Sequence, residues 1–207
     1  MKSIIKGNEP ASLIEHRAKQ YASYANFPKD NTRQSLLVEQ GHICCYCMKR
    51  IPESKVTPSS KIEHFLCQDD NKDEELNYKN MLLACSGQQG SPYRLQTCDT
   101  RKKNLILRHS PYSPTRNIEN LIKYKSNGEI YSTDDIFNTE LETVLNLNVK
   151  NLKDNRRVIY EELQNRIRIE GKKRGNKALQ KNFLETEKAK LLSLKNGKFS
   201  EFCMVGV

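Results

Sequence analysis

The sequence lacks any long apolar run, and this limits where the protein can act. No window of the 207 residues approaches the ~18 consecutive apolar residues of a membrane span, so we expect no membrane partner. The opening stretch, MKSIIKGNEP, has a basic start but too short an apolar segment for a secretory signal. We therefore expect a cytoplasmic protein.

Acidic residues are too few to balance the basic ones. The chain has 35 Lys and Arg against 25 Asp and Glu, a formal net charge of +10. This excludes an acidic chaperone-like or buffering protein and favours a polyanionic partner. Hydrophobic residues are scarce at 36%, yet not scarce enough for wholesale disorder. The length allows one core-bearing domain with an appendage, or two small domains.

The cysteines indicate a metal site. Seven cysteines, an odd number without an export signal, argue against a disulfide framework. Cys44 and Cys47 form a C-x-x-C motif, and Cys85 with Cys98 supplies the second thiolate pair of a tetrahedral zinc site made of four sulfurs. A redox motif is the alternative, but residues 48–52 run into a proline and a polar turn. The predicted zinc site leaves out three cysteines: Cys45, Cys67 and Cys203.

Hydrophobic patterning in the first half predicts two helices, two strands and a further helix. The helices are expected over 12–26 and 31–40, the second ending at Gly41. Short apolar stretches at 62–65 and 81–84 predict strands that flank an acidic loop. A third helix is expected to begin near Asp99.

The second half is expected to be a separate, mostly helical region. Two prolines within 109–116 predict a boundary between a domain at 1–110 and a region at 111–207. Asn127-Gly128 predicts a β-hairpin across 122–131. The chain beyond Thr133 has a helical pattern, which Gly171 and Gly175 are expected to break before a last helix at 176–195.

Positive charge is concentrated in this second half. Residues 150–198 contain fifteen Lys and Arg against six Asp and Glu, which is +9 of the total +10. The densest point is Lys172-Lys173-Arg174. Such a run is either a solvated helix face or a contact surface for nucleic acid or an acidic protein.

Residues 44–104 carry the groups that chemistry needs. A carboxylate stands next to a histidine at Glu63-His64, an asparagine precedes the next strand, and an acid and a lysine open the following helix. Phosphodiester hydrolysis requires such parts: a base for water, oxygen ligands for a hard cation, and positive charge nearby. Taken alone, a histidine on a strand is usually structural, so the prediction depends on the whole ordered set.

This ordered set resembles the HNH (ββα-metal) endonuclease superfamily, and within it the Septu and retron-associated PtuB-like nucleases of bacterial anti-phage defence. Four motifs carry the resemblance: L-L-x-E-Q-G-x-x-C-x-Y-C (36–47), I-E-H-F (62–65), N-x-L-x-x-C (80–85) and C-x-x-x-K (98–102). It implies an α+β fold with an HNH core stapled by a four-cysteine zinc site, N-terminal helices and a mostly helical basic C-terminal region.

The resemblance also implies residue roles. It makes His64 the general base, and places Glu63 and Asp99 on a catalytic Mg²⁺ or Mn²⁺, with Asn104 as the alternative to Asp99. Asn80 would orient the catalytic loop, and Lys102 would contact phosphate. The structural zinc would be bound by four ligands: Cys44, Cys47, Cys85 and Cys98.

The implied activity is hydrolysis of nucleic acid, DNA foremost, in partnership with an ABC/SMC-like ATPase (PtuA). A retron reverse transcriptase and its DNA–RNA product are further implied partners. Two alternatives remain open from the residues themselves: a zinc-stapled nucleic-acid-binding module without catalysis, and an adaptor whose helical tail docks an ATPase.

Overall fold

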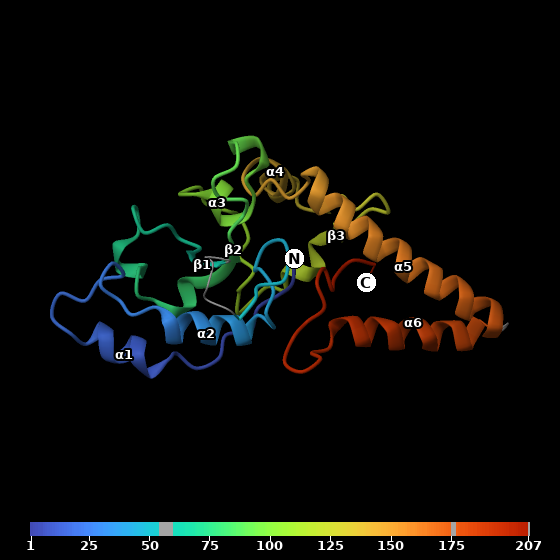
Figure 1. Cartoon of the computed structure of the whole chain (residues 1–207), viewed down its shortest axis with the longest axis horizontal. Coiled ribbons are helices and arrows are strands. Elements are labelled where there is room, and N and C mark those ends of the chain that lie inside the picture. The colour runs from blue at the N-terminus through green and yellow to red at the C-terminus, as the bar shows by residue number, and fades with distance from the viewer. Residues whose placement is uncertain (54–59, 175–176, 207) are drawn as a thin grey trace.

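The fold is α+β. The computed structural model describes residues 1–53, 60–174 and 177–206, and only the backbone of 171–174 and 177–180. This part of the chain forms six α-helices and two two-stranded antiparallel sheets (Figure 1). The helices are α1 (Ala11–Arg17), α2 (Asp30–Glu39), α3 (Cys98–Lys102), α4 (Asp135–Thr143), α5 (Lys150–Arg174) and α6 (Lys177–Leu192). The strands are β1 (Ser60–His64), β2 (Met81–Cys85), β3 (Ile122–Tyr124) and β4 (Ile130–Ser132).

The sheet formed by β1 and β2 lies at the centre of the first half. Its strands pair so that Glu63 stands opposite Leu82 and His64 opposite Met81. Residues 81–84 of β2 are fully buried, since α2 and α3 both contact this strand. An uninterrupted apolar run is what a strand covered on both faces requires. Both strands were predicted, and both are confirmed.

The first predicted helix is shorter in the structure than the sequence pattern indicated. α1 ends at Arg17, and Tyr21 has a φ of +62°, which no helix continues through. The Asn26 side chain accepts from the Ser23 amide and donates to the Tyr21 carbonyl, which closes a loop instead. Side-chain hydrogen bonding of this kind competes with helix formation. The second helix, α2, agrees with its prediction and is followed by Gly41 at φ +56°.

The predicted Asn-Gly hairpin is confirmed as β3 and β4. Gly128 has a φ of +81°, and a Cβ there would lie 2.0 Å from the Lys153 carbonyl oxygen of α5. The turn must therefore carry glycine to approach the helix so closely. The buried Arg156 of α5 fastens this contact, because its guanidinium donates to the carbonyls of Gly128 (2.6 Å) and Leu147 (2.7 Å).

Helices α5 and α6 form a long helical hairpin that extends away from the side occupied by α1 (Figure 1). Arg166 of α5 pairs with Glu187 of α6 at 2.8 Å. The expected break at Gly171 is wrong, because α5 continues to Arg174. A single glycine costs a helix only about 1 kcal/mol, which the neighbouring turns offset. Gly175 lies outside the described residues, as do the side chains of Lys172-Lys173-Arg174.

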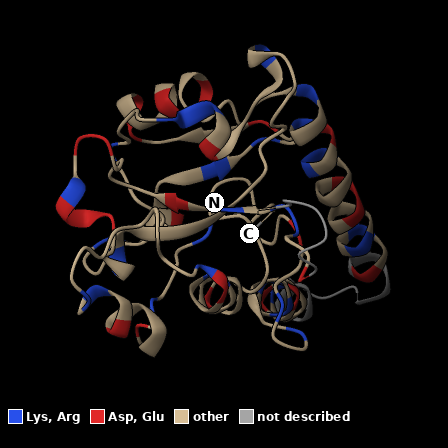
Figure 2. Ribbon diagram, turned by 60° about the vertical axis from the view of Figure 1, so that its left-hand side comes forward, with Lys and Arg blue, Asp and Glu red and all other residues tan. Residues whose placement is uncertain are grey.

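Basic and acidic residues alternate along the ribbon of α5 (Figure 2). Lys150 pairs with Asp154 at 2.5 Å, and Arg157 lies 3.6 Å from the same carboxylate. Part of the positive charge in this stretch is thus balanced within the helix. Within the described ranges, none of the helices has both the length and the apolar content that crossing a bilayer requires.

Both ends of the described chain pack across the predicted boundary at residue 110. The Ile4 amide donates to the Pro111 carbonyl, and the Ser3 amide donates to Glu119. Near the other end, Phe202 donates its amide to Met48, beside the C-x-x-C motif. A single hydrophobic cluster accordingly runs from Met1 to Val205. The division into two domains stays a prediction.

Candidate metal centre and adjoining polar pocket

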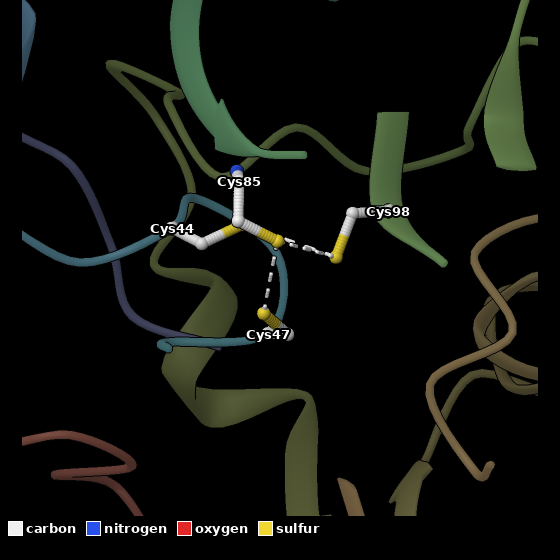
Figure 3. Close-up of side chains that lie close together, drawn as sticks. All are labelled: Cys44, Cys47, Cys85 and Cys98. Atoms are coloured by element: carbon white, nitrogen blue, oxygen red, sulfur yellow. Dashed lines mark hydrogen bonds between the residues drawn. The ribbon is translucent and has the colours of Figure 1, made fainter. Parts of the chain in front are cut away.

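Four cysteine sulfurs from three separate segments lie at one point. The Sγ–Sγ distances are 3.7 Å for Cys47–Cys85, 3.8 Å for Cys85–Cys98 and 3.9 Å for Cys44–Cys98, and all four sulfurs lie within 4.8 Å of one another (Figure 3). A tetrahedron of sulfurs around zinc at about 2.3 Å has edges of about 3.8 Å. The Sγ–Sγ distances therefore match those of four-coordinate zinc, and the cluster could hold a structural metal such as zinc.

The local backbone explains how the cluster forms. The Cys44 amide donates to Lys49 and the Met48 amide donates to Cys44, which folds the C-x-x-C motif into a tight turn with Met48 at φ +62°. The Cys45 amide then donates to the carbonyl of Leu83, the middle residue of β2, which places the turn beside that strand. Cys85 ends β2, and Cys98 is the first residue of α3.

The thiols are arranged to stabilise negative charge on Cys44. Burial raises the pKa of this thiol, but hydrogen bonds from the surrounding cysteines outweigh burial and leave its pKa well below the usual range. The Cys85 amide also donates to Cys44 Sγ at 3.3 Å. The same contacts with Cys44 raise the pKa of Cys47 and of Cys98 well above the usual range. Zinc binds thiolates. A cation at the centre of the cluster would therefore stabilise negative charge on all four sulfurs, which the thiols alone cannot do for one another.

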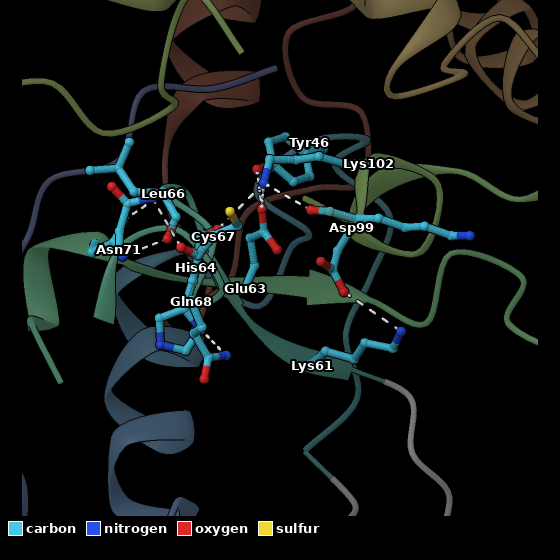
Figure 4. A network of polar contacts seen from close by, with 12 residues as sticks. Tyr46, Lys61, Glu63, His64, Leu66, Cys67, Gln68, Asn71, Asp99 and Lys102 are labelled. Atoms are coloured by element: carbon cyan, nitrogen blue, oxygen red, sulfur yellow. Dashed lines mark hydrogen bonds and ion pairs between the residues drawn. The ribbon is translucent and has the colours of Figure 1, made fainter. Parts of the chain in front are cut away.

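A buried ion pair lies next to the cysteine cluster. Oε1 of Glu63 accepts from the Tyr46 hydroxyl at 2.7 Å and lies 2.8 Å from Lys102 Nζ (Figure 4). Burial raises the pKa of Glu63 well above the usual range, and the neighbouring Asp99 carboxyl raises it further, while Lys102 opposes both. The Glu63 and Asp99 carboxyl groups together offer the oxygen donors that a hard cation prefers.

His64 follows Glu63 and has both ring nitrogens engaged. Nε2 lies 2.9 Å from the Glu75 carbonyl oxygen, which can only accept, so Nε2 carries the hydrogen. Nδ1 consequently holds the free lone pair, and it accepts from the Gln68 side-chain amide at 3.0 Å (Figure 4). Burial lowers the pKa of His64 below 6.5 despite the hydrogen bond to Glu75. Burial thus favours the neutral imidazole over the imidazolium.

Asn80 holds the loop that follows His64. Its Oδ1 accepts from the Leu66 amide at 2.8 Å, and its Nδ2 donates to the carbonyls of Leu66 (3.0 Å) and Glu74 (3.2 Å). Glu74 directly precedes Glu75, whose carbonyl binds His64. The buried Asn80 side chain therefore fixes both the segment that follows His64 and the segment that binds its ring. The orienting role that the resemblance implied for Asn80 stays a prediction.

A polar pocket of about 300 Å³ brings four of the predicted residues together: Glu63, His64, Asp99 and Asn104. Asp99 also faces Lys61, with 3.6 Å between Nζ and Oδ2 (Figure 4). Asn104 donates its amide to Asp69, a residue of the acidic loop. The pocket thus joins the end of β1, the start of α3 and the loop after His64 at one opening.

Lys102 lies elsewhere than the resemblance implied. Its side chain is 0% exposed, and its ammonium is committed to Glu63 rather than directed to a phosphate site. The cation that reaches the pocket from this segment is Lys103, the next residue, together with Lys72 of the acidic loop.

Sequence reasoning missed the partners of the histidine and the glutamate. The sequence pattern gave Tyr46 no role in the site, yet its hydroxyl binds Glu63. Gln68 lies in the loop four residues after His64. Glu75 contacts His64 through its backbone carbonyl and not through its side chain. Side-chain identity therefore carried no sign of the Glu75 contact. Cys67, which the predicted zinc site leaves out, lines the same pocket and donates to Asp70.

Comparison with protein-family models found none that matches this chain, and comparison with curated proteins found no match.

Proposed function

We propose that the protein is a metal-dependent HNH-type endonuclease that hydrolyses phosphodiester bonds of nucleic acid, foremost DNA. The observation that carries the proposal is the pocket in which His64, with its Nε2 fixed by a carbonyl, stands beside the carboxyl groups of Glu63 and Asp99. The order of two antiparallel strands followed by a short helix, tied by four cysteines, supports the comparison with ββα-metal nucleases.

In this proposal His64 acts through Nδ1. The Glu75 carbonyl keeps the hydrogen on Nε2, so the Nδ1 lone pair is the one able to take a proton from water. Gln68 must release Nδ1 before water can approach it. After proton transfer, the Glu75 carbonyl would also stabilise the imidazolium, because it accepts the Nε2 hydrogen in either state.

Glu63 and Asp99 would hold the catalytic cation, Mg²⁺ or Mn²⁺. Oε1 of Glu63 is already engaged by Tyr46 and Lys102, so Oε2 and the Asp99 carboxylate are the oxygens left for it. When bound, the cation supplies a Lewis acid for the charge that develops on the phosphoryl group. Lys102 acts indirectly, since it orients the Glu63 carboxylate from the buried side.

The cysteine cluster would hold a structural zinc, separate from the catalytic cation. Thiolates select zinc, whereas carboxylate oxygens favour Mg²⁺ or Mn²⁺, so two different metals can occupy neighbouring sites.

Within bacterial anti-phage defence, we place the protein among PtuB-like effectors that work with an ABC/SMC-like ATPase; a retron reverse transcriptase and its DNA–RNA product are the further partners of this proposal. In this proposal, the helical hairpin of α5 and α6 would contact such a partner.

Plasmid nicking tests the proposal. Zinc-loaded protein is incubated with supercoiled DNA, with Mg²⁺ or Mn²⁺ and without either. We expect cation-dependent cleavage that His64→Ala abolishes, while His16→Ala, a buried histidine of α1, leaves the rate within about twofold. Cleavage by His64→Ala at the wild-type rate would exclude the assigned base. Binding of DNA without cleavage under any cation would favour the non-catalytic zinc-stapled module.

A further inference from the structure

An exposed tyrosine stands on the segment that connects the last two cysteines of the cluster. Tyr93 is 52% exposed, within residues 86–97, whose two ends are fixed by Cys85 and Cys98. Arg101 Cζ lies 3.5 Å from the centre of its ring, and Lys103 Nζ lies 5.4 Å from it. Two cations beside one exposed ring form a surface that is both aromatic and positive.

The backbone beneath the ring is held by side chains. Arg101 donates to the Tyr93 carbonyl at 2.8 Å, and Asn146 donates to the carbonyls of Arg94 (3.0 Å) and Gln96 (2.8 Å). The exposed ring is therefore presented by a fixed turn rather than by a loose loop. Such preorganisation is what a binding surface needs, because little ordering is left to occur on binding.

Lys103 connects this surface to the candidate active site. The same side chain that approaches the Tyr93 ring also lines the pocket that contains His64. Arg94 and Leu95, which follow Tyr93 in the chain, are exposed as well. A polyanion whose phosphate lies at the pocket could thus continue over Lys103 towards the ring.

We infer that Tyr93, with Arg101 and Lys103, forms a stacking platform for an unpaired base of a nucleic-acid strand whose phosphates enter the His64 pocket. A single-stranded segment is required because the faces of bases inside a duplex are covered by the base pairs stacked above and below them. Nucleic acid is favoured over a protein partner by the two cations beside the exposed ring. The inference rests on the proposed function, since it names how that substrate is bound.

Affinity gives the first test. Binding of a labelled short oligothymidylate is measured in the zinc-loaded His64→Ala protein without added Mg²⁺, so that cleavage does not interfere. Tyr93→Ala should weaken binding by roughly five- to one-hundredfold, the range for loss of one stacked base. Lys103→Gln should lower the slope of log binding constant against log salt concentration by about one, the value expected for loss of one phosphate contact. The matched control is Tyr131→Ala, whose ring also faces a lysine, Lys125 at 5.5 Å, but this lysine, unlike Lys103, does not line the pocket.

Fluorescence gives the second test, because the chain contains no tryptophan. Tyr93→Trp introduces a single indole, whose emission should be quenched by the oligothymidylate and much less by a blunt duplex of equal length. Tyr131→Trp should respond to neither. Unquenched emission together with wild-type affinity in Tyr93→Ala would overturn the inference and assign this surface to a protein partner. Loss of binding in Tyr93→Ala without any cleavage by the wild-type protein would uphold the platform and reject the nuclease.

Discussion

Lys102 Nζ lies 2.8 Å from Oε1 of Glu63, and the two side chains are only 0% and 3% exposed. This ion pair attaches Lys102, the last residue of α3, to β1. Cys98, the first residue of α3, belongs to the cysteine cluster. A helix of five residues has no stability of its own. Its position against the β1–β2 sheet therefore depends on these two attachments.

Removing one partner of the buried pair should be strongly destabilising. Lys102→Met leaves the Glu63 carboxyl buried without its cation, and the free energy of unfolding should fall by about 3–5 kcal/mol. Adding Glu63→Gln in the same chain should restore most of this loss, because no unpaired charge remains. Denaturant unfolding of the two single variants and the double variant measures the coupling. Additive losses would show that the pair contributes nothing as a pair.

Zinc content should follow the four clustered cysteines. We expect one zinc per chain, and Cys98→Ser should lose the metal and lower the free energy of unfolding by more than about 4 kcal/mol. Cys45→Ser is the matched control, because this buried cysteine adjoins the cluster without belonging to it. Elemental analysis and thermal unfolding provide the measurements. Full zinc content in Cys98→Ser would contradict the proposed ligand set.

Gln68 should restrain His64. Gln68→Ala frees Nδ1, so we expect a several-fold faster reaction of His64 with diethyl pyrocarbonate and a higher nicking rate. Gln68→Asn, with a shorter side chain, should behave in the same way. Mass spectrometry of modified peptides follows His64, and His16, whose Nε2 contacts the Ser23 carbonyl, is the internal reference. Unchanged reactivity of His64 in both variants would reject the restraint.

Lys6 should make stability depend on alkaline pH. Burial lowers its pKa from 10.5 to about 8, although Glu39 lies 3.6 Å away and opposes the shift. Between these two values the unfolded chain binds the proton that the folded chain has lost. The contribution of Lys6 to stability therefore rises with pH across this window, by up to about 3 kcal/mol.

Comparison with Lys6→Met isolates this contribution from the other groups that titrate there. The wild-type free energy of unfolding, relative to that of the variant, should increase between pH 7 and about pH 10.5. Parallel pH profiles for the two proteins would contradict the lowered pKa.

Much of the candidate site could be predicted because its residues belong to short, ordered motifs. The C-x-x-C turn and the apolar runs of β1 and β2 form through local contacts, so their positions follow from spacing and periodicity. The lengths of α1 and α5 could not be predicted equally well. Asn26 closes a loop where the pattern continued as helix, and Gly171 is tolerated where a break was expected. Where each helix ends depends on free-energy differences of about 1 kcal/mol between local conformations, which tertiary packing can outweigh.

The sequence by itself determined which groups are available: four thiols for one metal, a carboxyl beside an imidazole, and an excess of positive charge. Only the tertiary structure decided what each group faces. It buried Lys102 against Glu63, turned Lys103 to the pocket, and occupied both nitrogens of His64 with Glu75 and Gln68. The reason is physical: a side chain's role depends on burial and on contacts between segments distant in the chain, and residue order alone specifies neither.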